Sequence, residues 1–340
     1  MELRPNTPPG AMSPSMEQRL RDLLSQAALE ILQGKSPAAA ITYRTVLQTI
    51  PQGTSLPSWI VPELKRAREV IEANNRALEA YIAEGVDDLR KLCPDEPLQR
   101  FDQCVDTLLQ KRRIYRQQPT FMFYPELPTI EFYDPHYFPW IDNLNAAAND
   151  IRDELLAVLQ DGSDKLEPYV SDQPGLPMDK WRELNNSRRW GVYILSQEGK
   201  VFDEHIARCP KTLAAINACP RWDVPGNGPT ALFSILDAKT HIPSHTGQVN
   251  TRLFVHLPLI VPPGCRFRVG GQTKQWEAGK TWVFDDTIDH EAWNDGDEPR
   301  AVLIFDVWSP FLSEQERQLI RALTKRMSEF YGTAPGGRGL

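Results

Sequence analysis

The sequence predicts an α+β protein in which a small all-helical region precedes a double-sheet jelly roll. Between residues 14 and 115, apolar side chains recur at spacings of three and four, which is typical of amphipathic helices. From residue 190 onward the pattern changes to short strand-like runs that are separated by Pro and Gly. Many short strands after a helical segment favour two sheets that pack face to face.

The helical region is expected to span residues 14–115. Four helical runs are predicted there, at residues 14–32, 37–50, 61–92 and 97–113. Residues 34–51 resemble one degenerate tetratricopeptide repeat, but a plain helical bundle fits equally well, because a single repeat cannot bury its own apolar face. The flanking segments 1–13 and 333–340 are rich in Pro, Gly and polar residues, and we expect them to be disordered.

The jelly-roll domain is expected to span residues 120–332. Residues 119–140 carry eight aromatic side chains and repeated prolines, which indicates an extended segment that wraps over a sheet. A helix follows at residues 142–160, and the motif Ser-Glu-Gln-Glu at 313–316 is a capping box that opens a closing helix. The predicted strands are residues 190–196, 230–237, 250–261, 266–269, 281–285 and 300–307.

Composition limits the function classes. The net charge of −7 and the lack of a long Lys/Arg cluster argue against nucleic-acid binding. The longest apolar stretch, residues 253–263, is too short to span a bilayer, and the first ten residues lack the apolar core of a signal peptide. Five widely spread cysteines without a Cys-x-x-Cys pair indicate neither a disulfide framework nor a zinc site. We therefore expect a soluble protein in the reducing cytoplasm.

Histidines cluster in the strand-rich half. Four of the six in the chain, His241, His245, His256 and His290, lie between residues 241 and 290. A single histidine is more often a hydrogen-bonded strand residue than a ligand, but the clustering favours a metal site, and neutral imidazole binds divalent iron. Pro243 argues against a helix that would carry His241 and His245 together, so a helical metalloprotease motif is not indicated.

Arg300 opens the last predicted strand, residues 300–307, which is otherwise apolar except for one aspartate. A buried charge without a partner is costly, so this guanidinium is expected to meet an anion inside the protein. A guanidinium fork matches a carboxylate with two hydrogen bonds, which favours an organic acid as that anion.

Six motifs, in order, resemble the aspartyl/asparaginyl β-hydroxylase family over residues 120–312. They are HTG at 245–247, NTRLFVH at 250–256, WEAGK at 276–280, VFDD at 283–286, HEAW at 290–293 and RAVLIFDVW at 300–308. The resemblance implies an Fe(II)- and 2-oxoglutarate-dependent dioxygenase on a double-stranded β-helix, which is a cupin-like jelly roll. It also implies that dioxygen is consumed and that succinate and CO2 are released.

The resemblance implies that His245 and His290 hold the iron and are the catalytic pair. Many relatives add a carboxylate two residues after the first histidine, but this chain has Gly247 there. The aspartyl hydroxylases are similar in this respect. Asp285 and Asp286 are therefore expected to shape the turn or to lie outside the metal's ligand set.

The resemblance also implies a binding site for 2-oxoglutarate. Arg300 and Ser234 would hold the distal carboxylate, and His256 would lie at the keto-acid end near the metal. Trp190 would form a wall of this pocket, although a buried core aromatic is nearly as good an interpretation. Trp293 is a further candidate to cover the iron.

One departure from the family concerns the substrate. Relatives that hydroxylate Asp or Asn in epidermal-growth-factor-like domains carry an arginine two residues before the histidine at position 256, where this chain has Phe254. Arg252 lies on the same strand face by alternation, so both residues are candidates for substrate contact. The loss of a cation removes a partner for an acidic side chain.

Three functions follow as hypotheses. The first is hydroxylation of an aspartyl/asparaginyl-like or other peptidyl or amino-acid substrate, with the helical region as a docking surface for a protein partner. The second is hydroxylation of a lipid acyl chain, which Phe254 would suit. The third is a non-catalytic jelly-roll binding module, against which the retention of His245, His290, Arg300 and Ser234 weighs, because such groups are costly to bury without a ligand. A peptide, a protein or a small molecule is the expected partner, and a nucleic acid is not.

Overall fold

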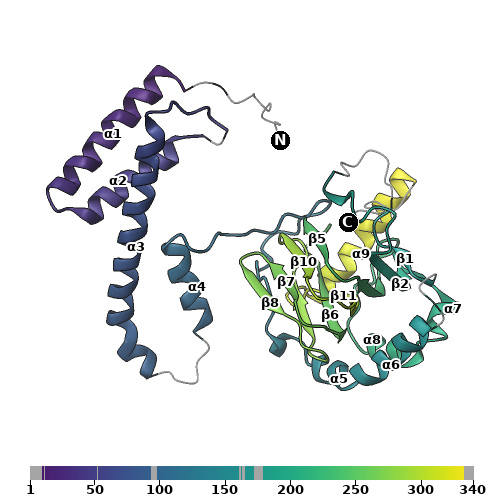
Figure 1. Ribbon diagram of the computed structural model, residues 1–340. Helices are drawn as coiled ribbons and strands as arrows, with labels where there is room; N and C mark the ends of the chain where they lie inside the picture. Colours follow the sequence, from purple (N-terminus) through teal and green to yellow (C-terminus); the bar gives the residue numbers. More distant parts are fainter. Residues whose placement is uncertain are drawn as a thin grey trace. The chain divides into compact units, whose positions relative to one another are not determined.

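The computed structural model describes residues 10, 12–51, 53–92, 98–160, 162, 165–171 and 179–332. The chain divides into two compact units, Met1–Arg112 and Arg113–Leu340 (Figure 1). The disorder expected at 1–13 and 333–340 falls on residues outside these ranges, apart from Gly10, Met12 and Ser13.

The first unit consists of the helices α1 (Pro14–Leu32), α2 (Ser36–Thr49), α3 (Ile60–Lys91) and α4 (Gln99–Leu108). Helix α1 begins where the Ser13 side chain accepts a hydrogen bond from the backbone N–H of Met16. Gly34, with φ of +70°, lies in the turn between α1 and α2. The three longer helices bury one common core, which includes Leu20, Ala27, Tyr43, Val46, Ile60 and Ile71. The tetratricopeptide-like interpretation of residues 34–51 stays a prediction.

The second unit contains two antiparallel sheets. The strands are β1 (Glu167–Pro168), β2 (Trp190–Gln197), β3 (Lys200–Val201), β4 (Ala231–Leu236), β5 (Thr240–His245), β6 (Arg252–Ile260), β7 (Cys265–Val269), β8 (Gln272–Gln275), β9 (Trp282–Phe284), β10 (His290–Asn294) and β11 (Arg300–Trp308). The larger sheet has the order β1-β2-β4-β11-β6-β9, with β3 paired to β2, and the smaller has the order β5-β10-β7-β8. The strands from β4 to β11 thus divide between the sheets as 1-8-3-6 and 2-7-4-5, which is a double-stranded β-helix. The predicted fold class is confirmed.

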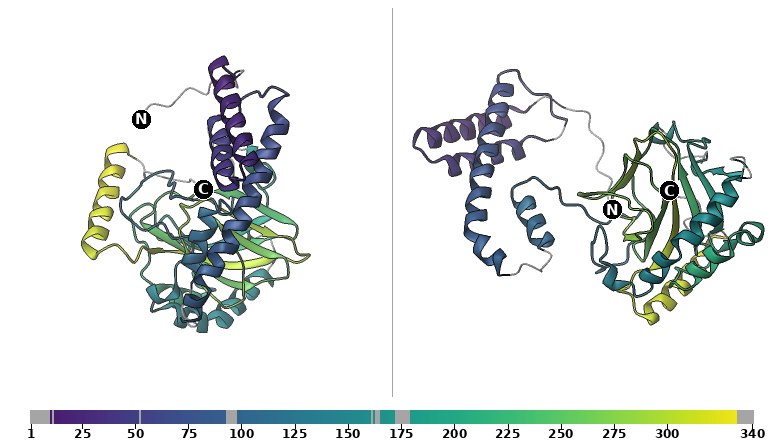
Figure 2. Two further views of the ribbon diagram at one scale, coloured as in Figure 1. Left: turned by 90° about the vertical axis from the view of Figure 1, so that its left-hand side faces the viewer. Right: turned by 60° about the horizontal axis from the view of Figure 1, so that its bottom comes forward.

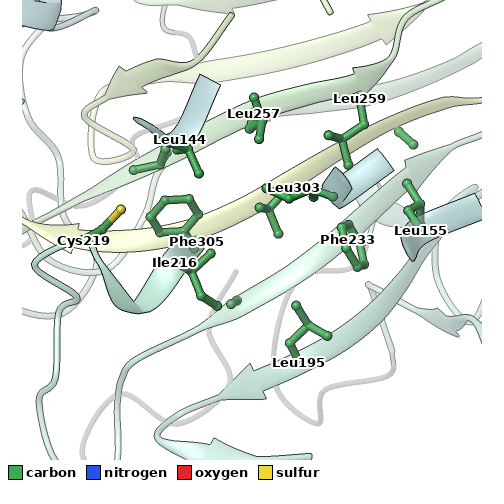
Figure 3. Close-up of a cluster of buried hydrophobic side chains, with 14 of the residues drawn as sticks. Leu144, Leu155, Leu195, Ile216, Cys219, Phe233, Leu257, Leu259, Leu303 and Phe305 are labelled. Atoms are coloured by element: carbon green, nitrogen blue, oxygen red, sulfur yellow. The ribbon is translucent and has the colours of Figure 1, made fainter. Parts of the chain in front are cut away.

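Helices cover the outer face of the larger sheet. Helices α5 (Ile141–Ala146), α6 (Ala148–Gln160) and α8 (Pro210–Asn217) lie against it (Figures 1 and 2). Their buried side chains, such as Leu144, Leu155 and Ile216, join one apolar cluster with the strands (Figure 3). The short helix α7 (Asp203–Ile206) follows β3. Helix α9 (Glu314–Tyr331) closes the unit and begins at the predicted capping box of Ser313 and Glu316.

Strand alternation decides which residues of the larger sheet face the smaller one. On β11, Leu303 and Phe305 belong to the cluster beneath the helices, whereas Val302 belongs to the cluster between the sheets. Because successive side chains of a strand point to opposite faces, even-numbered residues in the regular parts of β2, β4, β6 and β11 face inward. The predicted site residues Trp190, Ser234, His256 and Arg300 all have even numbers.

The aromatic segment before α5 extends along the sheets, as the sequence predicts. Phe132 forms an isolated antiparallel bridge with Phe284, and the backbone N–H of Tyr133 donates to the carbonyl of Val283 at 2.9 Å. Thr120 donates its backbone N–H to the carbonyl of Gly247 at 3.0 Å. This segment therefore holds the connection between β5 and β6, which follows the first candidate ligand.

Candidate metal and cosubstrate site

His245 and His290 lie opposite each other on neighbouring strands of the smaller sheet. His245 ends β5, His290 begins β10, and the two are paired in register. Their ring centroids are 4.1 Å apart. The structure thus brings together two imidazoles that are 45 residues apart in the chain.

Both rings are held in the same tautomer. Nδ1 of His245 lies 2.8 Å from the carbonyl oxygen of Pro243, and Nδ1 of His290 lies 3.0 Å from that of Ile288. A carbonyl oxygen can only accept, so each Nδ1 carries the proton and each Nε2 keeps its lone pair. Backbone carbonyls that fix a ring in this way are typical partners of metal-binding histidines.

The imidazoles are neutral at physiological pH. Burial and the neighbouring His290 hold the pKa of His245 well below its ordinary value, although the Pro243 carbonyl acts in the opposite direction. Burial also lowers the pKa of His290 to about 4. A metal ion needs the neutral form, and both imidazoles are in that form at physiological pH.

Arg300 is the largest fully buried side chain of the described residues. Its Nε and Nη1 have no hydrogen-bond partner, and no carboxylate pairs with it within the part of the chain that the structure describes. Burial lowers its pKa to about 10, which leaves the guanidinium charged at neutral pH. It lies 4.7 Å from the ring centroid of Trp276, which compensates only part of the lost hydration. An anionic ligand would complete this environment.

Ser234 and Trp190 form a buried pair beside Arg300. Nε1 of Trp190 donates to Oγ of Ser234 at 3.0 Å. The serine hydroxyl hydrogen stays available for another acceptor, so Ser234 can donate to a carboxylate. Trp190 is stacked on Tyr169 with centroids 4.0 Å apart, which fixes the indole plane. Trp190 is therefore both a wall and the residue that orients Ser234.

His256 is a third histidine of this region and is buried. Its Nδ1 is buried and has no partner among the described residues. Burial, together with the charge of Arg300, lowers the pKa of His256 well below its ordinary value. A neutral imidazole with an unsatisfied nitrogen is a polar group that a ligand could satisfy.

One cavity of about 500 Å³, measured with its open mouth, joins these groups. The residues that line it include the candidate site residues His245, His290, His256, Arg300, Ser234, Trp190 and Phe254. The rest of the lining is apolar or aromatic, with Phe267, Trp276 and Phe284 from the core between the sheets. This combination of a few convergent polar groups and an apolar wall is typical of small-molecule sites.

Gly247 and Asp286 explain why no third protein ligand stands beside the histidines. A Cβ at position 247 would lie 1.8 Å from Oδ2 of Asp286, so the aspartate carboxylate occupies the space of a side chain there. Asp286 in turn accepts a hydrogen bond from Arg252 at 3.2 Å. Among the described residues, no group of three His, Cys, Asp or Glu side chains is arranged to hold a metal. Within the described part of the chain, the two histidines are therefore the candidate ligands, without a third side chain.

The two substrate candidates separate in the structure. Phe254 lines the cavity, whereas Arg252 is paired with Asp286 and is absent from the lining. The guanidinium of Arg252 lies 4.7 Å from the ring of Phe254, so the two share one strand face, as alternation predicts. Asp285 accepts from Thr287 and Gln117 and shapes the turn before His290.

Two residues considered from the sequence lie elsewhere. His241 stacks on Trp293 with centroids 5.0 Å apart, and its Nε2 contacts Glu291 at 3.0 Å. The expectation that Trp293 covers the iron is wrong, because on β10 the neighbouring residue Ala292 faces the cavity and Trp293 faces outward.

Sequence reasoning assigned no role in the site to several aromatic neighbours, Tyr169 and Trp181 among them, or to one cation. Tyr169 lines the cavity, and Trp181 meets His245 edge-on with centroids 5.3 Å apart. Both come from irregular or 3-10 segments without a periodic pattern, so no sequence signal marks them. Arg268 bonds the residues on either side of His290, and alternation on the predicted strand 266–269 gives no reason to single it out.

The fold and the site define a jelly-roll protein with a two-histidine candidate metal site beside a buried cation. Residues 145–310 match the family model described as aspartyl/asparaginyl beta-hydroxylase. Over these residues the chain resembles the aspartyl/asparaginyl beta-hydroxylase family. The predicted family resemblance is confirmed.

Curated relatives show the same match. Human aspartyl/asparaginyl beta-hydroxylase is 35% identical over 174 residues, which cover 51% of this chain and 21% of the relative. The ornithine lipid ester-linked acyl 2-hydroxylase of Rhizobium tropici is 35% identical over 193 residues, 56% of this chain and 64% of the relative. Human aspartate beta-hydroxylase domain-containing protein 2 is 29% identical over 212 residues, 60% of this chain and 54% of the relative. The chain therefore spans less than two thirds of each of these relatives.

None of the helices in the described residues has both the length and the apolar character that crossing a bilayer requires.

Proposed function

We propose that the protein is an Fe(II)- and 2-oxoglutarate-dependent dioxygenase that hydroxylates an unactivated C–H bond and releases succinate and CO2. One observation carries the proposal: a single cavity joins a neutral histidine pair to a buried guanidinium that lacks a carboxylate partner among the described residues. A metal ion and a carboxylate ligand would satisfy both ends. The match of residues 145–310 to a hydroxylase family supports the same reaction class.

Each residue of the cavity has a role in this proposal. His245 and His290 would hold the iron through their Nε2 atoms, and iron when bound supplies dioxygen activation coupled to oxidation of the keto acid. Arg300 would grip the distal carboxylate of 2-oxoglutarate, and the hydroxyl of Ser234 would donate to the same group. His256 would form a hydrogen bond with 2-oxoglutarate at its keto-acid end. The aromatic lining excludes bulk water and strengthens these polar contacts.

The substrate proposed first is an aspartyl/asparaginyl-like or other peptidyl or amino-acid group. The chain's match to a relative named aspartyl/asparaginyl beta-hydroxylase supports it. A second candidate is a lipid acyl chain. Phe254 favours it, because an aromatic ring rather than a cation lines the cavity at this position. The match to a relative named as an acyl 2-hydroxylase supports the same alternative. The helical unit would serve as a docking surface for a protein partner.

The direct test is succinate production from 2-oxoglutarate with Fe(II) under air. We expect succinate above the background of a His245→Ala, His290→Ala double variant, with further stimulation by the correct substrate class. Peptides with Asp or Asn and acyl-chain amides form the two substrate arms. Bound iron without any succinate, uncoupled turnover included, would contradict the enzyme proposal and favour the non-catalytic binding module.

A further inference from the structure

We infer that Arg268 is a positioning residue that fixes the placement of His290 relative to His245 from the outer face of the smaller sheet. The inference rests on the proposed two-histidine metal site. It concerns four residues, Arg268, Asp289, Glu291 and Ser244, which are called the Arg268 clamp below. None of them lines the cavity.

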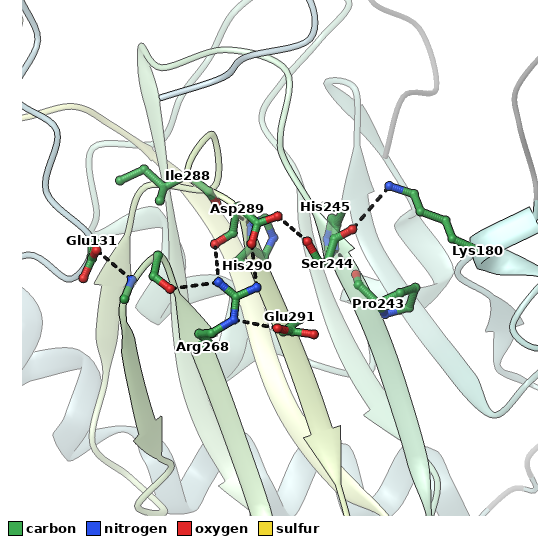
Figure 4. Close-up of polar contacts among 12 residues, drawn as sticks. Glu131, Lys180, Pro243, Ser244, His245, Arg268, Ile288, Asp289, His290 and Glu291 are labelled. Atoms are coloured by element: carbon green, nitrogen blue, oxygen red, sulfur yellow. Dashed lines mark hydrogen bonds and ion pairs between the residues drawn. The ribbon is translucent and has the colours of Figure 1, made fainter. Parts of the chain in front are cut away.

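The clamp holds the residues on both sides of His290. Nη2 of Arg268 donates to Oδ1 of Asp289 at 2.5 Å, and Nε donates to Oε1 of Glu291 at 2.6 Å (Figure 4). Nη1 donates to the carbonyl of Gly270 at 2.8 Å, so the guanidinium is also tied to its own strand end. His290 stands between the two carboxylates in the chain.

The clamp also reaches the other histidine. The hydroxyl of Ser244 donates to Oδ2 of Asp289, and His245 is the next residue after Ser244. The carboxylate of Asp289 therefore contacts Arg268 through one oxygen and Ser244 through the other. Figure 4 shows this connection from Arg268 on β7, through Asp289, to Ser244 on β5.

The backbone pairing of β10 with β5 is irregular beside the two histidines, so side-chain contacts there can add to what holds the strands together. The register of β10 against β5 shifts between His290 and Ala292, where Pro243 and Ser244 face Glu291 alone. An irregularity of this kind disrupts the ladder of backbone hydrogen bonds and lets the strand bend. Side-chain bonds across the irregularity then limit how far the two imidazoles can move apart.

The ion pairs of Arg268 are partly shielded from water, so they contribute more to local geometry than exposed pairs would. The side chains of Arg268 and Glu291 are 16% and 17% exposed, and that of Asp289 is 31% exposed. Water screens such pairs less than exposed ones, and the planar guanidinium orders both carboxylates at once. A lysine would keep the charge but could not donate three bonds in this fixed fork.

The test is Co(II) binding to the full chain, because the visible absorption of Co(II) reports ligand geometry without turnover. We expect Arg268→Lys to weaken Co(II) binding about tenfold and to change the spectrum. Ser244→Ala should act in the same direction to a smaller extent. The matched control is Arg266→Lys, because Arg266 lies on the same strand face, pairs with Asp295 at 3.2 Å and stacks on Trp293 at the far end of β10, away from His290. That variant should bind Co(II) as the wild type does.

The outcomes separate this role from the proposed function. Wild-type affinity and spectrum in both Arg268→Lys and Ser244→Ala would overturn the positioning role while leaving the metal site intact. If Arg268→Lys does not fold, Ser244→Ala decides the question alone. A wild-type chain that binds no Co(II) would overturn the proposed metal site and the positioning role together.

Discussion

At the scale of the residue, the site depends on groups that the fold leaves unsatisfied. Among the described residues, Arg300 is buried with two nitrogens unpartnered, and His256 is buried with one. Asp286 fills the space where a side chain at position 247 would stand. The sequence identifies Arg300 and the histidines because charged and titratable residues stand out in apolar strands. It could not show that Asp286 meets Gly247, because that contact joins separate loops.

The Arg300→Met substitution is expected to abolish 2-oxoglutarate binding while it raises the stability of the ligand-free protein. It removes a buried charge that has no carboxylate partner among the described residues, so the free energy of unfolding of the ligand-free protein should rise by about 1 kcal/mol. Binding of 2-oxoglutarate should be lost. Thermal or denaturant unfolding and calorimetry measure the two effects.

A matched control for Arg300→Met is Arg221→Met. The side chain of Arg221 is 10% exposed, and it pairs with Asp306 at 3.6 Å. Its removal leaves the buried carboxylate of Asp306 with the backbone N–H of Thr230 but without its ion-pair partner, and should lower the free energy of unfolding by about 3–5 kcal/mol. Equal destabilisation by the two substitutions would contradict the view that Arg300 lacks an internal partner.

Metal binding is expected to resist acid. The folded pKa of His290, about 4, and that of His245 lie below the ordinary value of 6.5, so protons compete with the metal only at low pH. Mn(II) affinity should therefore change little between pH 8 and about 6 and should fall as pH approaches 4. Electron paramagnetic resonance of free Mn(II) measures this. A steep loss that begins above pH 6.5 would show that the imidazoles are not shifted.

At the scale of the element, alternation along a strand places residues that stabilise the fold on one face and residues that line the cavity on the other. Leu303 on β11 is fully buried beneath the helices, whereas Ile304 lines the cavity. Leu303→Ala should lower the free energy of unfolding by about 2–5 kcal/mol without changing 2-oxoglutarate affinity. Ile304→Ala should weaken 2-oxoglutarate binding with a smaller loss of stability. The reverse pattern would place the cavity on the other face of β11.

The larger sheet was predictable and the smaller sheet was only partly so. Strands β2, β4, β6 and β11 are apolar on both faces, because helices cover one side and the second sheet covers the other. Strands β5, β8 and β10 were not predicted as strands. Strands β5 and β10, with the sequences THIPSH and HEAWN, combine a partly exposed outer face with a candidate histidine inside, whereas β8, with the sequence QTKQ, is polar throughout, so apolar periodicity is missing in all three. In β5 and β10 the candidate functional residues themselves remove the apolar pattern.

At the scale of the whole molecule, every residue that lines the cavity belongs to the unit Arg113–Leu340. The helical unit has a separate core of its own. The family match likewise falls on residues 145–310. The proposed chemistry is therefore a property of the jelly-roll unit, and the helical unit is left with the proposed role in docking a partner.

The central claim is that the histidine pair and Arg300 bind one ligand between them, with the metal at one end and the guanidinium at the other. Its most direct test is the affinity of the full chain for 2-oxoglutarate, measured by calorimetry without oxygen, with and without Mn(II). The account predicts that Mn(II) strengthens this affinity at least about tenfold and that 2-oxoglutarate strengthens Mn(II) binding by the same factor. His290→Ala should abolish this coupling. Equal 2-oxoglutarate affinity with and without Mn(II) in the wild-type protein would contradict the claim.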